Sequence, residues 1–103
     1  MAEGRIVLSG FSSEPAEKAI ADNLIKSYKN KISERIGFDE IDLRVKKSRH
    51  GKTFLHEVQG RMISTGKQFN SKVTDYNLFS ALAEVLEKLM HEAEHNMRTR
   101  RQK

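Results

Sequence analysis

The chain has 103 residues, enough for one hydrophobic core, so a single compact domain is the simplest expectation. It contains no cysteine, which excludes disulfide bonds, thiolate metal sites and cysteine nucleophiles. Nineteen Lys and Arg against fourteen Asp and Glu give a net charge of +5, which favours a polyanionic partner. The longest apolar run near the start, residues 6–8, is too short for a signal peptide or a membrane span, so we expect a cytoplasmic protein without membrane contact.

The first segment predicts a strand followed by a long helix. The run RIVLSG (5–10) is β-branched and ends at glycine, which predicts a buried first strand. Ser13 or Glu14 can cap a helix, and Pro15 suits its first turn. Apolar residues then recur at every fourth position: Ile20, Leu24, Tyr28, Ile32 and Ile36. We expect one amphipathic helix that ends near Gly37.

Residues 40–75 predict three consecutive strands. The run EIDLRVKKS (40–48) alternates strictly between apolar and polar residues, the pattern of a half-buried strand. A turn around Gly51 then leads into a second run, 53–64, where Gly60 suggests a bulge or bend. After another turn, KQFNSKV (67–73) predicts the last strand.

The final segment predicts a second helix. TDYN (74–77) offers several capping side chains. The apolar stripe that follows consists of Leu78, Leu82, Val85, Leu86, Leu89 and Ala93. The order is therefore β-α-β-β-β-α, an α+β fold in which two helices pack on one face of a four-stranded sheet. We assign residues 1–97 to this single domain and expect residues 98–103 to form a basic, disordered tail.

The sequence HEAEH (91–95) matches the H-E-x-x-H pattern of zinc metalloproteases. At 100° per residue, both histidines fall opposite the stripe centred on Leu82 and Leu89, so we expect them to face water. A third ligand would have to come from His50 or His56, and nothing in the pattern places either one nearby. We predict no catalytic residue, no metal site and no cofactor, and keep a zinc hydrolase that uses His91, Glu92 and His95 as an alternative.

Basic residues gather in two clusters, RVKKSRHGK (44–52) and RTRRQK (98–103). Two further lysines, Lys26 and Lys29, fall on the expected solvated face of the first helix. Each cluster by itself is equally well explained as a solvated turn or a frayed terminus.

Residues 69–89 (FNSKVTDYNLFSALAEVLEKL) resemble the strand-to-helix junction of the ribosome hibernation-promoting factor family. The matching positions are Asn77, Leu78, Phe79, Ala81, Leu82, Glu87, Lys88 and Leu89. The start, LSG followed by EKAIADNLIKSYKNKI, is similar to the family's first turn and helix. The resemblance implies a β-α-β-β-β-α fold similar to double-stranded RNA-binding domains. It further implies a non-enzymatic protein that binds the small ribosomal subunit and inhibits translation or protects idle ribosomes. At residues 91–95 the chain departs from the family, whose last helix continues there with lysine and arginine.

We therefore expect ribosomal RNA as the partner, contacted through basic side chains. The candidate residues are Lys26, Lys29, Arg44, Lys46, Lys47, Arg49, Lys52, Lys88, Arg98, Arg100 and Arg101. A second hypothesis is a protein-interaction or assembly module of the same fold, homodimers included, which would use the uncovered sheet face or an edge strand. Leu55 and Ile63 motivate it, because they fall on the opposite strand face from Phe54 and Val58.

Overall fold

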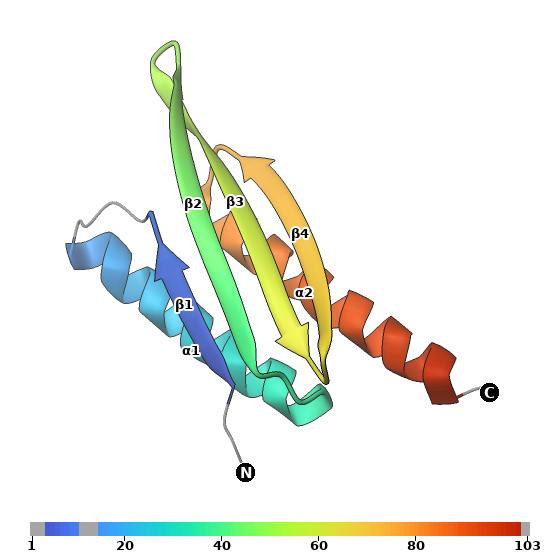
Figure 1. Cartoon of the computed structure of the whole chain (residues 1–103). Helices are drawn as coiled ribbons and strands as arrows, with labels where there is room; N and C mark the ends of the chain where they lie inside the picture. Colours follow the sequence, from blue (N-terminus) through green and yellow to red (C-terminus); the bar gives the residue numbers. More distant parts are fainter. Residues whose placement is uncertain (1–3, 11–14, 102–103) are drawn as a thin grey trace.

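A computed structural model describes residues 4–10 and 15–101, with side chains as far as residue 96. The elements follow in the predicted order: β1 (Arg5–Ser9), α1 (Pro15–Arg35), β2 (Glu40–His50), β3 (Thr53–Ser64), β4 (Lys67–Asp75) and α2 (Leu78–Arg101). The sheet has the order β1-β2-β3-β4, in which β1 runs parallel to β2 and the other neighbours are antiparallel. Both helices pack on one face of this sheet, as predicted (Figure 1). The other face, which we call the outer face, carries no helix.

The first strand is a half-buried edge strand, whereas the sequence predicted a buried one. Ile6 and Leu8 pack partly against the core, while Val7 points to the outer face and is 39% exposed. Only alternate residues of a strand can face the helix layer, so three consecutive apolar residues cannot all be covered from one side.

The first helix begins at Pro15 and ends at Arg35, close to the predicted bounds. The capping candidates at positions 13 and 14 lie outside the described residues. Its apolar row was predicted correctly at Ile32 but wrongly at Ile20, which is 52% exposed. Four residues advance an α-helix by about 40° more than one full turn, so a strict row of every fourth residue winds around the helix. Ala21, not Ile20, lies on the buried side.

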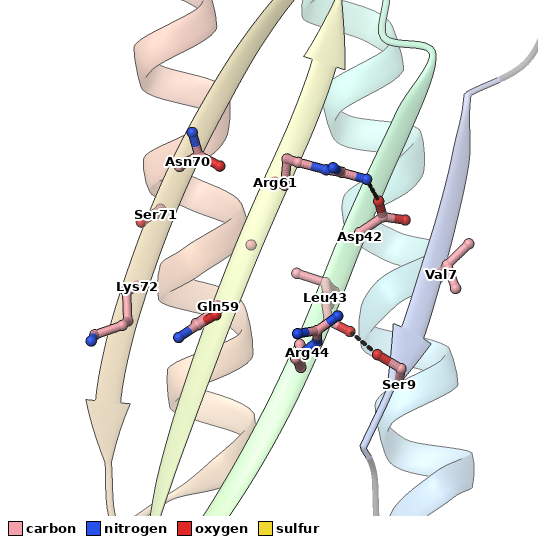
Figure 2. A pocket seen from close by; sticks show the side chains of 11 residues that line it. Val7, Ser9, Asp42, Leu43, Arg44, Gln59, Arg61, Asn70, Ser71 and Lys72 are labelled. Carbon is pink, nitrogen blue, oxygen red and sulfur yellow. Dashed lines mark hydrogen bonds and ion pairs between the residues drawn. The ribbon is translucent and has the colours of Figure 1, made fainter.

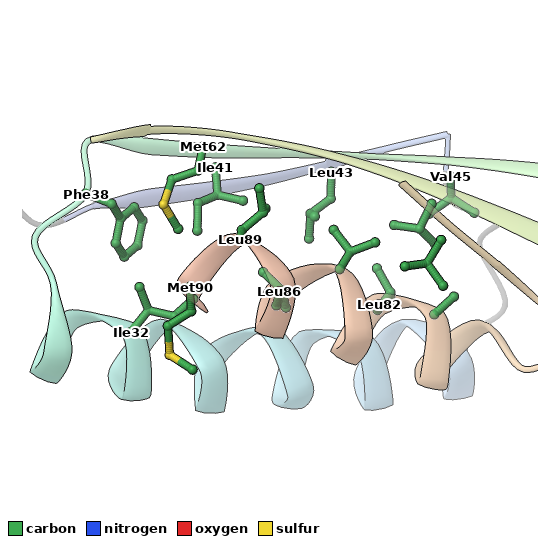
Figure 3. Packing of buried hydrophobic residues seen from close by; sticks show 14 of the residues in the cluster. Ile32, Phe38, Ile41, Leu43, Val45, Met62, Leu82, Leu86, Leu89 and Met90 are labelled. Atoms are coloured by element: carbon green, nitrogen blue, oxygen red, sulfur yellow. The ribbon is translucent and has the colours of Figure 1, made fainter. Parts of the chain in front are cut away.

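The core fills the space between the sheet and the two helices (Figure 3). β2 contributes alternate residues, as its pattern predicted: Ile41, Leu43 and Val45. α2 contributes more buried apolar residues than any other element, namely Leu78, Ala81, Leu82, Val85, Leu86, Leu89, Met90 and Ala93. The predicted stripe of α2 is thus confirmed, and it fixes which sheet face the helices cover.

Gly60 does not form a bulge, one of the two features that the sequence suggested for it. β3 pairs with both of its neighbours without an extra residue on either side. The reason for glycine is the approach of α2, because a Cβ at position 60 would lie 2.4 Å from Cγ1 of Val85 and 2.9 Å from Cδ1 of Leu89. Gly60 therefore lets α2 lie close against the sheet.

The second helix is capped by Asn77, whose Oδ1 accepts a hydrogen bond of 3.0 Å from the backbone N–H of Ser80. The backbone is helical through Arg101, so α2 includes residues 98–101 of the expected tail, and the disorder of that tail stays a prediction. Residues 96–101 contain neither glycine nor proline, so no residue in this stretch ends the helix. Residues 102–103 lie outside the described part, and the domain boundary at residue 97 stays a prediction.

The molecule is elongated, with extents of 52 × 25 × 17 Å. The β2–β3 hairpin projects beyond the other strands at one end, and the C-terminal part of α2 extends at the other (Figure 1). Within the described residues, neither helix contains a stretch long and apolar enough to cross a membrane.

Candidate nucleic-acid interface

The β2–β3 hairpin continues as a two-stranded ribbon after its neighbours have ended. The last residue of β1 to pair with β2 is Ser9, opposite Arg44, and β4 pairs with β3 only as far as His56. Residues 45–55, which we call the ribbon, therefore belong to β2 and β3 alone (Figure 1). The ribbon turns at Gly51, as predicted, with the positive φ of 62° that a two-residue hairpin loop requires.

Four cations stand on the ribbon, Lys46, Lys47, Arg49 and Lys52, and we call them the ribbon cations. All four are exposed, and no Asp or Glu occurs between positions 43 and 56. Among the described residues, none of the four lies within ion-pair distance of a carboxylate. The ribbon therefore carries uncompensated positive charge, which is the electrostatic condition for binding phosphate groups.

An exposed aromatic ring lies among these cations. Phe54 is 45% exposed, and Nζ of Lys47 lies 4.3 Å from the centroid of its ring. Arg49 is directly opposite Phe54 in the β2–β3 register. Sequence reasoning did not single out Phe54 as a binding residue. A sequence signal was nevertheless present. On the face of β2 that carries the core residues, positions 47 and 49 are Lys and Arg instead of apolar residues, which indicates that no helix covers this part of the strand.

The outer face of the sheet contains a shallow depression of about 660 Å³, shown in Figure 2. Arg44, Arg61 and Lys72 supply its cations, and Ser9, Gln59 and Asn70 supply neutral polar groups. Among the described residues, Arg44 is the one cation of this depression without an ion pair, and it adjoins the base of the ribbon.

The carboxylates of the outer face are engaged by other cations. Arg61 donates a hydrogen bond to Asp42 and lies 3.9 Å from Glu40, which also accepts from Arg5 at 2.9 Å. The hydrogen bond from Arg61 lowers the pKa of Asp42. Lys72 lies 3.9 Å from Glu57. These pairs remove much of the charge from the outer face and leave the ribbon as the positive end of the sheet.

The predicted lysines of the two helices do not form one surface with the ribbon. Lys26 and Lys29 border a small hollow between α1 and β1, together with Gly4 and Asp22. Lys88 lies on α2 and pairs with Glu84 at 3.4 Å. Its side chain points about 100° away, around the helix axis, from that of Glu87, which pairs with Lys31 of α1.

The two helices are joined by ion pairs that use other cations. Nζ of Lys31 donates to Glu87 at 2.8 Å, and Arg35 lies 3.4 Å from Glu94. The hydrogen bond from Lys31 lowers the pKa of Glu87, and burial, followed by the charge of Glu87, raises the pKa of Tyr28. Lys31 and Arg35 are thereby neutralised, so cations at the helix–helix seam offer little free charge.

The remaining predicted contacts lie on the last turns of α2. Arg98, Arg100 and Arg101 are part of its helical backbone, and their side chains lie outside the described part of the structure. Their contribution to RNA binding stays a prediction.

In the HEAEH segment, His91 and His95 lie on the exposed side of α2, as predicted. The side chain of His91 is 65% exposed, and its Nε2 lies 3.8 Å from Glu87. His95 is also exposed. Within residues 4–10 and 15–101, no group of three or more His, Cys, Asp or Glu side chains gathers where a metal ion would need them.

The apolar residues behind the assembly hypothesis lie on the outer face of β3, as expected, but they do not form a continuous patch. Leu55 and Ile63 are half-buried, and the positions between them on this face are Glu57, Gln59 and Arg61. A polar and charged surface thus separates the two side chains, and this arrangement is unlike an apolar interface core.

The fold as a whole matches a known structure. The N-terminal domain of Protein Y from Thermus thermophilus superposes over 92% of this chain and 98% of its own, with 17% sequence identity and a TM-score of 0.54. The chain has the Protein Y N-terminal fold. A ribosomal subunit interface protein from Coxiella burnetii matches over 96% of this chain and 99% of its own, with 16% identity and a TM-score of 0.49. No protein-family model and no curated protein matches the sequence.

The likeness to the Protein Y domain confirms the fold that the resemblance at residues 69–89 implied. At 17% identity it speaks for the fold alone. The similarity to double-stranded RNA-binding domains stays a prediction. Among the side chains that the structure describes, which end at residue 96, unpaired positive charge is most concentrated on the ribbon.

Proposed function

We propose that this protein is a non-enzymatic, cytoplasmic RNA-binding protein that associates with the small ribosomal subunit and modulates translation. The observation that carries the proposal is the ribbon, whose four cations have no carboxylate partner among the described residues. The resemblance of residues 69–89 to the hibernation-promoting factor family supports a ribosomal partner, and the Protein Y fold supports that resemblance.

Such binding requires phosphate neutralisation by a rigid scaffold. Each phosphate that a Lys or Arg neutralises releases bound counterions, so affinity falls as salt rises. The ribbon is anchored in the core at its base by Val45 and Val58, which are 7% and 0% exposed. Its cations therefore reach outward from a fixed platform.

The test is cosedimentation of the protein with purified small ribosomal subunits over a series of salt concentrations. We expect association at low salt that is lost at high salt. A variant with the four ribbon cations changed to glutamine should bind more weakly, and its salt dependence should fall by about 3 to 4 in the log–log slope. Failure of the wild type to sediment with small subunits at low salt would refute the proposal.

A charge-matched variant controls for net charge. It carries glutamine at four other exposed cations, none of which takes part in the ion pairs between the helices: Arg5, Lys18, Lys67 and Lys72. The two variants lose the same charge, so the ribbon variant must bind more weakly than the control for the ribbon to be the main contact. Equal losses would mean that net charge alone drives association.

The proposal includes secondary contacts outside the ribbon: Arg44, Lys26, Lys29, Lys88, Arg98, Arg100 and Arg101. The lysines of α1 and α2 lie on separate surfaces. We therefore expect that neutralising those of one helix reduces the slope of log affinity against log salt independently of neutralising those of the other. Modulation of translation is measured by adding the protein to a cell-free translation reaction. The ribbon variant should change the yield less than the wild type does.

A further inference from the structure

Phe54 is an apolar side chain that lies outside the hydrophobic core. It shares a strand face with Val58, but four residues of a strand place the two about 13 Å apart. Val58 is fully buried under α2, whereas Phe54 is 45% exposed on the ribbon. Folding therefore leaves much of this ring in water, where an aromatic side chain contributes little to stability.

The surroundings of the ring are cationic on one side of the ribbon. Lys47, Arg49 and Phe54 point to the same face, because position 49 pairs with position 54 and position 47 is the next residue on that face of β2. Nζ of Lys47 lies 4.3 Å from the ring centroid, and no carboxylate occurs in the ribbon sequence. A ring with Lys47 beside it and Arg49 opposite it in the strand register presents a surface for a base, together with charge for the phosphates that flank it.

We propose that Phe54 is a stacking platform for an unpaired RNA base, with Lys47 and Arg49 neutralising the adjacent phosphates. This inference rests on the proposed function and narrows it to single-stranded or looped RNA. In a duplex, each base is already stacked and paired, so its ring faces are not available to Phe54. The other ribbon cations, Lys46 and Lys52, contribute charge without selecting between paired and unpaired RNA.

The test uses the absence of tryptophan from the chain. Phe54→Trp places one tryptophan at the proposed platform, where it can be excited separately from the two tyrosines, and stacking with a base quenches indole fluorescence. Titration with a short oligouridylate should quench the signal. An RNA duplex with the same number of phosphates should bind through charge and quench far less. Equal quenching by the two RNAs, or none by oligouridylate, would overturn the stacking platform.

A matched control comes from Tyr76, another exposed aromatic residue, 63% exposed and outside the ribbon. Tyr76→Trp should show little quenching with oligouridylate. In binding assays with oligouridylate, Phe54→Leu keeps the apolar bulk and loses the stack, so affinity should fall about 5- to 150-fold with the salt slope unchanged. Tyr76→Leu should bind as the wild type does. If Phe54→Leu binds as tightly as the wild type, or if Tyr76→Leu loses as much affinity, the assignment to Phe54 is wrong.

The outcomes separate this inference from the proposed function. If Phe54→Leu sediments with small subunits like the wild type and keeps the same salt dependence, the ribosomal proposal stands and the platform falls. If the wild type binds neither oligouridylate nor small subunits, both fall. The melting temperature of Phe54→Leu should stay near that of the wild type because the ring lies outside the core, so a binding defect cannot be attributed to unfolding.

Discussion

Gly60 gives the sharpest test of how α2 is seated on the sheet. In Gly60→Ala the new Cβ would lie 2.4 Å from Cγ1 of Val85 and 2.9 Å from Cδ1 of Leu89. Carbon atoms pack at about 3.5 Å or more, so α2 must move away by about 1 Å or the side chains must leave their rotamers. Val85 and Leu89 are both 0% exposed and surrounded by core residues, which leaves little room for a movement of α2 or for a change of rotamer.

The magnitude follows from two opposing effects. Overpacking of this kind costs about 1 to 3 kcal/mol, while replacing glycine by alanine reduces the entropy of the unfolded chain and stabilises by about 0.4 to 1 kcal/mol. We expect a net loss of about 1 to 2 kcal/mol, or a fall of about 4 to 16 °C in melting temperature, followed by circular dichroism. Gly37→Ala is the control, since no heavy atom lies within 4 Å of a Cβ there, and its change should be within about 0.5 kcal/mol.

A double-mutant cycle identifies the contact responsible. Val85→Ala removes the Cγ1 atom that the new Cβ would meet, so Gly60→Ala should cost less in a Val85→Ala background. The expected coupling is about 1 kcal/mol in the compensating direction. A Gly60→Ala variant as stable as the wild type, or a cycle without coupling, would refute the close approach of α2.

Two further substitutions test the ends and the pairing of the helices. Asn77→Ala removes the side-chain oxygen that accepts from the N–H of Ser80 and should lower the free energy of unfolding by about 1 kcal/mol. Asn77→Asp keeps an accepting oxygen and should melt near the wild type. Equal losses in the two variants would exclude the cap. The pKa of Glu87 is lowered chiefly by its hydrogen bond with Lys31, so the pair stabilises the fold at neutral pH, and this contribution is lost as pH falls below about 4.3 toward the lowered value. Because both side chains are partly exposed, we expect Glu87→Gln to cost about 0.2 to 1 kcal/mol at pH 7 in urea unfolding and to lose that difference in acid; a pH-independent difference would contradict the assignment.

Local patterns predicted most of the fold correctly. The alternation of β2, the turn at Gly51 and the apolar stripe of α2 each depend on neighbouring residues only, and all three are confirmed. The errors arose where the outcome depended on how one element packs against another. A row of every fourth residue did not reveal that Ile20 rotates away from the sheet, and a glycine in a strand did not reveal that a helix would lie against it.

The candidate site divides in the same way. Sequence alone determined that the chain is basic and that five cations without an acid gather at 44–52 around a hairpin turn. Only the tertiary structure showed that this hairpin extends beyond the ends of β1 and β4, and that Phe54 lies exposed beside Lys47. It also decided that the lysines of the two helices lie on separate surfaces. The physical reason is that strand alternation and helix periodicity show which face of its own strand or helix a residue occupies. Whether that face is buried, and which charges lie near it, depends on how far the neighbouring strands and helices extend.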